Sequence, residues 1–234
     1  MKKYLIKFWP LYLITMAGMI FIATASSHMV TTMAENRPIL REKVIVIDAG
    51  HGGEDGGATS CSGVLESKIN LEISLKLDAL LHFLGYETKM IRTSDVSVYT
   101  EGNSIAAKKA SDLKNRVKLV NETEDALLIS IHQNIFADSR YSGAQVFYNT
   151  VEGSKELAQA LQTAFVASIN PESNRKIKPA NDVYLMEHIK SPGVLVECGF
   201  LSCPEEEAKL RTGEYQQKIC CVIVSTVSTF LSNT

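Results

Sequence analysis

Three short, largely apolar runs in the chain each lead into a side chain of the kind that binds metals or transfers protons. The runs cover residues 44–47, 126–131 and 193–196, and the side chains that follow them are His51, His132 and Glu197. Continuous apolar runs rich in β-branched residues are typical of strands buried on both faces, as in a parallel sheet. Open α/β sheets bind ligands outside the carboxyl ends of their strands, so these three residues mark a candidate site.

Other segments repeat their apolar residues every three or four positions, which predicts amphipathic helices. The clearest follows Glu66 and ends at Gly85, with Ile69, Ile73 and Leu77 on its apolar face. Further helices are expected over residues 112–121, 153–169, 204–210 and 215–231. Strands are expected over residues 86–91, 144–148 and 183–186, and surface loops over the polar stretch 98–111 and the basic stretch 170–179. The alternation of strands and helices predicts one three-layer α/β domain.

The residue types at the three strand ends indicate a metal site. His51 alone could be an ordinary turn histidine among the glycines that follow the first strand. However, His132 and Glu197 follow two further apolar strands in the same way, and this favours a shared role for the three residues. Imidazole and carboxylate are the ligands of catalytic zinc, where three protein groups leave a fourth position for water.

Two more residues have both a structural and a chemical interpretation. Glu66 lies just before the first helix, where the helix dipole favours an acidic side chain. The same position makes it a candidate third ligand, brought beside His51 by the glycine-rich loop. His188 could be a fourth ligand, but the open position of catalytic zinc favours a loop histidine lining the cleft.

Arginines and cysteines have less specific interpretations. Arg92 and Arg116 could bind substrate carboxylates, although structural pairing with nearby acids is favoured. The five cysteines are an odd number, so at least one is unpaired. Cys198 should point away from Glu197 by strand alternation, and Cys198 and Cys203 lack the close spacing of zinc-binding cysteines. Cys220 and Cys221 are expected to be core thiols.

Composition limits the class of protein. The chain has 234 residues, 45 % of them hydrophobic and 21 % charged, which is ordinary for a globular domain with a substantial core. Its formal net charge of −2 gives no bulk attraction to nucleic acid, so no nucleic-acid partner is expected. The glycine-rich loop after the first strand lacks the lysine of a phosphate-binding loop, which argues against a nucleotide.

The N-terminal residues predict export. Three lysines among the first seven residues precede an apolar run over residues 8–25, and small residues at 23–25 suit signal-peptidase cleavage. We expect residues 1–25 to be a signal peptide or membrane anchor and residues 26–42 to be a polar linker. Residues 43–234 then form a catalytic domain outside the cytoplasm, with membrane contact only through the N-terminal segment.

Five strings, in this order, carry a resemblance to a known family. They are VIVIDAGHGGEDGG, VLESKINLEISLKLDALLHFLGYETKMIRTSD, LLISIHQN, SGAQVFYN and GVLVECGFLS. Together they resemble the zinc-dependent N-acetylmuramoyl-L-alanine amidases of the Amidase_3 family, over roughly residues 44–231. The family fold is a mixed, mostly parallel sheet of about six strands with helices on both faces.

The resemblance implies a role for each matching residue. His51, Glu66 and His132 match the family's zinc ligands, and Glu197 matches its catalytic glutamate. The implied substrate is peptidoglycan, cut between N-acetylmuramic acid and the L-alanine of the stem peptide. A zinc peptidase that cuts within the stem peptide and a non-catalytic wall-binding protein remain the alternatives.

The resemblance is strongest to the sporulation members of the family, which help to make muramic-δ-lactam in the spore cortex. The implied location is the cell wall or the space between the forespore membranes. Ala49 stands where the family usually has proline, and Cys203 where it usually has asparagine, which bears on how tightly the protein holds its metal. With no wall-binding module recognised in the chain, we expect a protein partner that activates or targets the enzyme.

Overall fold

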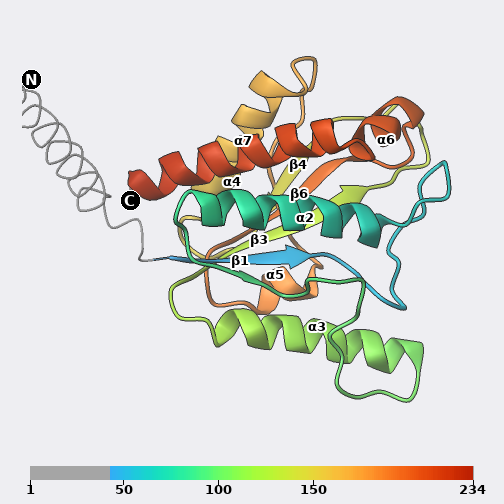
Figure 1. Cartoon of the computed structure of the whole chain (residues 1–234), viewed down its shortest axis with the longest axis vertical. Helices are drawn as coiled ribbons and strands as arrows, with labels where there is room; N and C mark the ends of the chain where they lie inside the picture. The colour runs from blue at the N-terminus through green and yellow to red at the C-terminus, as the bar shows by residue number, and fades with distance from the viewer. Residues whose placement is uncertain (1–42, 234) are drawn as a thin grey trace, which may run out of the picture. The chain divides into compact units, whose positions relative to one another are not determined.

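A six-stranded sheet organises the residues that the computed structural model describes, which are 43–233 (Figure 1). Its strands are β1 (Val44–Ala49), β2 (Thr88–Met90), β3 (Ala126–Asn134), β4 (Gln145–Tyr148), β5 (Lys178–Pro179) and β6 (Gly193–Phe200). They lie in the order β2-β1-β3-β6-β4-β5. Only the β4–β6 pair is antiparallel. This confirms the mixed, mostly parallel sheet implied by the resemblance.

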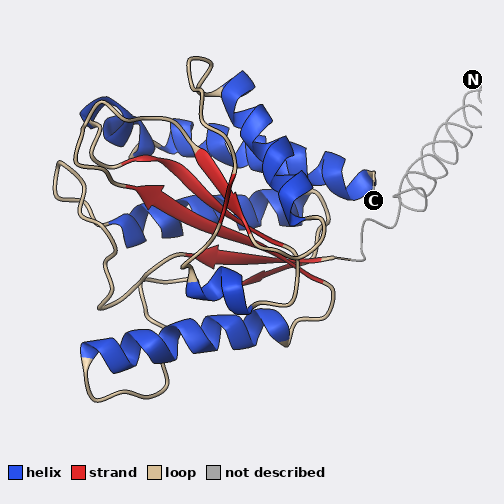
Figure 2. Ribbon diagram, turned by 180° about the vertical axis from the view of Figure 1, so that it is seen from behind, coloured by secondary structure: helices blue, strands red, loops and turns tan. Residues whose placement is uncertain are grey.

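Helices cover both faces of this sheet, which confirms the three-layer α/β prediction (Figure 2). One face carries α2 (Glu66–Phe83), α4 (Ser154–Ser168) and α7 (Gly213–Ser232), with α6 (Pro204–Leu210) beside α7 and β6. The other face carries α3 (Ile105–Asn121) and the short α5 (Tyr184–His188). The loops that follow the parallel strands lie at the carboxyl ends of those strands.

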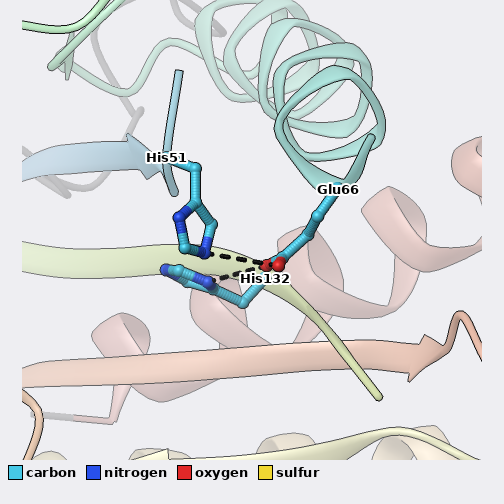
Figure 3. Close-up of side chains that lie close together, drawn as sticks. All are labelled: His51, Glu66 and His132. Carbon is cyan, nitrogen blue, oxygen red and sulfur yellow. Dashed lines mark hydrogen bonds and ion pairs between the residues drawn. The ribbon is translucent and has the colours of Figure 1, made fainter. Parts of the chain in front are cut away.

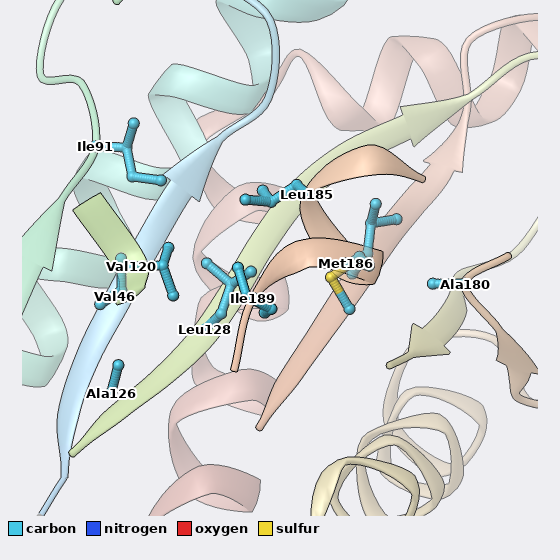
Figure 4. Packing of buried hydrophobic residues seen from close by; sticks show 10 residues of the cluster. Val46, Ile91, Val120, Ala126, Leu128, Ala180, Leu185, Met186 and Ile189 are labelled. Carbon is cyan, nitrogen blue, oxygen red and sulfur yellow. The ribbon is translucent and has the colours of Figure 1, made fainter. Parts of the chain in front are cut away.

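Strand alternation divides the core between the two faces. Val46 of β1 and Leu128 of β3 pack with Val120 of α3 and with Leu185 and Met186 of α5 (Figure 4). Successive side chains of a strand point to opposite faces, so the neighbours of Val46 and Leu128 face α2 and α7. Because β1 and β3 are parallel and in register, Asp48 of β1 lies beside Ser130 of β3 on the same face as Val46 and Leu128. Both of these residues are polar.

Three segments differ from the prediction. The basic stretch 170–179, expected to be a loop, ends in the two-residue strand β5. Residues 183–186 were expected to be a strand and instead open α5, because a four-residue apolar run does not distinguish a strand from one buried helical turn. The expected loop over 98–111 contains the first turns of α3, which begins at Ile105 after its N-cap Ser104. The buried residues of α3 are Ser111, Arg116 and Val120, so the apolar period that marks a helix is weak there.

Several expectations about the rest of the chain have clear outcomes. Cys198 and Cys220 are buried while Cys221 is exposed, so only one thiol of the C-terminal pair belongs to the core. All five cysteines are free within residues 43–233. The predicted signal segment and linker, residues 1–42, lie outside the described residues. Among the helices that are described, none is both long and apolar enough to cross a membrane.

Candidate metal centre and active site

The turn after β1 presents His51 in an unusual backbone conformation. His51 has φ 61°, in the left-handed region that costs a residue with a side chain roughly 1–2 kcal/mol. Two buried guanidinium groups hold this turn. Arg92 donates to the carbonyls of Ala49 and Gly50 at 2.7 and 3.0 Å, and Arg116 donates to the carbonyl of His51 at 2.7 Å. The turn is therefore constrained by contacts that do not depend on the side chain of residue 49.

Glycine at position 50 makes room for the second histidine. A Cβ on Gly50 would lie 2.2 Å from Nε2 of His132, closer than real atoms approach. His132 comes from β3, the strand that pairs with β1, so its ring lies directly over the turn. Its ring centroid is 5.0 Å from that of His51.

Glu66, the first residue of α2, completes the group (Figure 3). Its Oε1 lies 2.9 Å from Nδ1 of His132, and its Oε2 lies 3.3 Å from Nε2 of His51. One potential ligand atom from each of the three residues lies within 4.8 Å of the others. Glu66, which had two interpretations in the sequence, therefore sits between both histidines.

The surroundings of the three side chains fit a metal ion. The second ring nitrogen of His51, Nδ1, lies 3.0 Å from Oδ2 of Asp55. Zinc-binding histidines usually hydrogen-bond a carboxylate or carbonyl through their other nitrogen, which orients the ring. Two imidazoles and one carboxylate match the donor set of a catalytic zinc site with one open position.

The carboxylate of Glu66 is held in its charged form. Burial raises its pKa, but hydrogen bonds with His132 and His51 and their positive charge lower that pKa well below its usual range. Backbone N–H groups of Ala58 and Gln133 also donate to it, at 2.9 and 3.2 Å. An ionised carboxylate at this position is suited to bind a cation.

Glu197 lies next to this group on the adjacent strand. It is the register partner of His132 in the parallel β3–β6 pair, so both side chains project from the same face. Its buried Oε2 has no hydrogen-bond partner among residues 43–233. Burial raises the pKa of Glu197 to about 7, His132 and His51 oppose this rise, and Glu66 adds to it. A carboxyl with a pKa near neutrality can accept and release protons under physiological conditions.

The remaining sequence candidates are not among the three residues that could hold a metal ion. His188 is exposed at the end of α5, and its carbonyl accepts from Asn121 at the last residue of α3. That contact places it toward the amino ends of the parallel strands, so the expectation that His188 lines the cleft is wrong. Arg116 pairs with Asp48 and Asp112, as favoured from the sequence, whereas Arg92 donates to backbone carbonyls and pairs with no acid among residues 43–233. Cys198 is fully buried and its pKa is raised well above the usual range by that burial.

One contributor was not singled out from the sequence. Asp55 supports His51 through a local contact four residues along the loop, and it also pairs with Lys109 of α3 at 3.2 Å. The signal for it was an acidic residue inside the same glycine-rich loop. The contact with Lys109 depends on the packing of α3 against the loop and had no such signal.

Two imidazoles and a carboxylate facing one point, with a buried carboxyl beside them at the end of a parallel sheet, are typical of metal-dependent hydrolases. The sequence matches the Amidase_3 family, described as N-acetylmuramoyl-L-alanine amidase, over residues 45–229. The chain belongs to this family. It is an amidase that acts on peptidoglycan, and its action is therefore extracytoplasmic.

Individual relatives agree with this assignment. The germination-specific N-acetylmuramoyl-L-alanine amidase of Bacillus subtilis is 37% identical over 186 residues, which cover 79% of this chain and 78% of that protein. The CwlD amidase from Clostridioides difficile, solved in complex with the GerS lipoprotein, is 37% identical with a TM-score of 0.79. That match covers 83% of this chain and 100% of the solved chain.

A further solved structure, an N-acetylmuramoyl-L-alanine amidase from Clostridium difficile 630, is 30% identical with a TM-score of 0.71. It covers 83% of this chain and 98% of the solved chain. The resemblance read from the five strings is confirmed at the level of the family. The family assignment favours the amidase over the stem-peptide peptidase and the non-catalytic wall-binding protein.

Proposed function

We propose that this amidase holds one zinc ion through His51, Glu66 and His132 and uses Glu197 as its general base and acid. The scissile bond is the amide between N-acetylmuramic acid and the L-alanine of the stem peptide. The observation that supports this most directly is the convergence of the three ligand-type side chains within 4.8 Å. Half-buried Glu197 on the neighbouring strand supplies the second part, since its Oε2 is buried without a hydrogen-bond partner among residues 43–233.

The residues around the reacting amide have distinct tasks. A zinc ion held by His51, Glu66 and His132 would supply Lewis acidity toward water and the amide carbonyl. Glu197 accepts the proton of the attacking water and passes it to the leaving nitrogen, since an amide cannot depart as an anion. Asp55 keeps the ring of His51 in one orientation. Glu66 stays ionised because the two imidazoles beside it lower its pKa, and it accepts a hydrogen bond from the backbone N–H of Ala58.

Metal content tests the ligand assignment. Elemental analysis of the purified protein should find one zinc per chain, and His132→Ala should lose it. His188→Ala is the matched control, since it removes an exposed histidine away from the group, and it should keep its zinc. Unchanged zinc in His132→Ala would contradict the assignment.

Product analysis tests the reaction. Mass spectrometry of digested peptidoglycan should show intact stem peptides with a free L-alanine amino terminus, and a chelator should abolish them. Glu197→Gln should keep the fold and zinc and lose turnover by roughly 10²- to 10⁴-fold, the usual contribution of a positioned acid–base group. Glu156→Gln, an exposed glutamate on α4, should leave turnover unchanged. Full activity in Glu197→Gln would remove this residue from the mechanism.

The cellular role proposed is formation of muramic-δ-lactam in the spore cortex, after export through the N-terminal segment. Support comes from the germination-specific relative and from CwlD, which was solved in complex with a lipoprotein. We also propose that an accessory protein assists zinc binding or positioning. Zinc affinity and turnover of the pure protein should rise when extract from sporulating cells is added. No difference would argue against the partner.

A further inference from the structure

A hollow lies at the same edge of the sheet as the proposed zinc site. It has a volume of about 680 Å³ and is formed by the segment after β3 and the segment after α4, with Tyr141, Gly143, Asn170 and Arg175 in its walls. Both segments lie at the carboxyl end of β3, because β4 runs antiparallel to β6 and α4 returns from its far end. The hollow is large enough for several residues of a peptide.

A row of side chains connects the hollow with the catalytic group. His132 pairs with Glu197 in β3–β6, and Glu197 pairs with Gln145 in β6–β4. Directly paired residues project from the same face, so these three side chains form one line across the sheet. Neighbouring strands are about 4.8 Å apart, which places Gln145 about 5 Å from Glu197 and about 10 Å from His132.

Gln145 holds the side chain of Arg175, which lies beyond it on the side away from Glu197. Its Oε1 accepts from Nη1 of Arg175 at 3.1 Å, and its Nε2 donates to the carbonyl of Lys176 at 2.8 Å. Nε of Arg175 donates to the carbonyl of Ser142 at 2.8 Å. The guanidinium also stacks on Phe200, with 4.3 Å from Cζ to the ring centroid. Arg175 is therefore held in one orientation before any ligand arrives.

The charge of Arg175 has no direct acidic partner among residues 43–233. In the part of the chain that the structure describes, no carboxylate lies within 4.0 Å of it, and Nη2 makes no hydrogen bond. Arg140, the other arginine of the hollow, is already paired with Asp138 at 2.6 Å. Burial lowers the pKa of Arg175, and the charge of Glu206 opposes this. The carboxylate of Glu206 accepts from the backbone N–H groups of Gly143 and Phe200.

We propose that Arg175 determines substrate specificity by binding the free carboxylate on the second residue of the stem peptide. A planar guanidinium that is already oriented suits a carboxylate, because it offers parallel N–H donors at little further entropy cost. This inference rests on the proposed function, since it takes the scissile amide to lie beside Glu197. Gln145 acts as a positioning residue for Arg175.

The distances fit that assignment. An extended chain advances about 3.5 Å per residue, so the second residue of the stem peptide lies about 7 Å from the scissile amide. The guanidinium of Arg175 hydrogen-bonds Gln145, and Gln145 is the register partner of Glu197 on the neighbouring strand, so the guanidinium lies on the side of Glu197 where a carboxylate on that residue would be. The sugar side of the substrate then extends in the opposite direction, away from the hollow.

The test compares two substrates that differ at one group. N-acetylmuramoyl-tripeptide is prepared with the second-residue carboxylate free or converted to the carboxamide. The wild-type enzyme should prefer the free acid in kcat/KM by roughly 10- to 150-fold, the range for a hydrogen bond to a charged group. Arg175→Gln should lose this preference by slowing the free acid alone. Arg175→Lys should keep part of it, and Arg140→Gln, on the rim of the same hollow, should keep all of it.

Two outcomes would overturn the assignment. One is a wild-type enzyme that cleaves acid and amide equally well. The other is an Arg175→Gln enzyme that slows both substrates by the same factor, which indicates a purely structural role. If the wild-type enzyme cleaves neither substrate, the proposed function fails, and calorimetric binding of the free tripeptide and its amide then decides. In that measurement the wild-type protein should bind the free tripeptide more tightly than its amide, and Arg175→Gln should not. Equal binding of the two peptides by the wild-type protein would contradict the inference.

Discussion

Arg116 links the core of the sheet to the turn that carries His51. Its side chain is 3 % exposed and contacts four acceptors. It donates to Asp48, to the carbonyl of Ala49 at 3.1 Å, to the carbonyl of His51 at 2.7 Å and to Asp112 at 2.6 Å. We predict that Arg116→Met, which keeps the length of the side chain and removes its charge, lowers both stability and zinc affinity.

The magnitude follows from what the substitution leaves behind. Asp48 is 1 % exposed, and without Arg116 the only side-chain partner left to it among residues 43–233 is Ser130 at 2.6 Å. Removing one member of a buried ion pair costs about 3–5 kcal/mol, because the other charge stays buried. A whole domain is stable by only about 5–15 kcal/mol, so the loss should be large. His51 also loses the donor to its carbonyl, and such supporting contacts are worth roughly 10- to 100-fold in metal affinity.

Guanidinium chloride unfolding and competitive zinc titration measure the two effects. Lys118→Met is the matched control on the same helix, since Lys118 is exposed and pairs with Glu122 only at 3.8 Å. It should change stability by less than about 0.5 kcal/mol. The double variant Asp48→Asn with Arg116→Met should be more stable than Arg116→Met alone, because the buried charge of Asp48 is removed together with its partner. A loss of less than about 1 kcal/mol in Arg116→Met would refute this reasoning.

Three further predictions concern pH, the histidine contact and helix α3. Burial raises the pKa of Asp48, but the charge and hydrogen bond of Arg116, the hydrogen bond of Ser130 and the charge of His132 together lower it below its usual value of 3.8. The stabilisation from ionised Asp48 is therefore present above 3.8 and is lost as the pH falls through the lowered pKa, and acid unfolding of the double variant should lack this component. Gly50→Ala should displace the ring of His132 and weaken zinc binding in a competitive titration, whereas Gly213→Ala, with nothing within 4 Å, should not. Ser104→Ala should lower the free energy of unfolding by about 0.5–2 kcal/mol, measured by thermal unfolding, because it removes the N-cap of α3. An unchanged stability would show that the hydrogen bond from the N–H of Ala107 to Oγ of Ser104 contributes nothing.

The strands that carry the site were predictable because their signal is local. The apolar runs before His51, His132 and Glu197 are long enough to read as buried strands, and all three form strands of the central sheet. The helix after Glu66 was equally clear, since its buried positions recur with helical spacing. The five strings also identified the family, which the match over residues 45–229 confirms.

Predictions failed where a segment takes its structure from distant partners. The apolar residues of α5 suit a strand or a helix equally, and packing of Leu185 and Met186 against the sheet selects the helix. Helix α3 buries Arg116 against Asp48, a contact between residues far apart in the chain. The predicted location of His188 was wrong for the same reason. The residues around His188 in the sequence do not indicate the direction in which α5 crosses the sheet.

The amino-acid sequence alone determined the kinds of chemistry this protein can perform and the strands that present it, because residue type and apolar spacing are properties of neighbouring positions. Tertiary structure decided that Glu66 lies between two histidines, that Arg92 and Arg116 hold the turn of His51, and that Arg175 is left with an unpaired donor. These depend on strand register and on helices crossing the sheet. Strand pairing brings together residues whose separation along the chain carries no information about their distance in space.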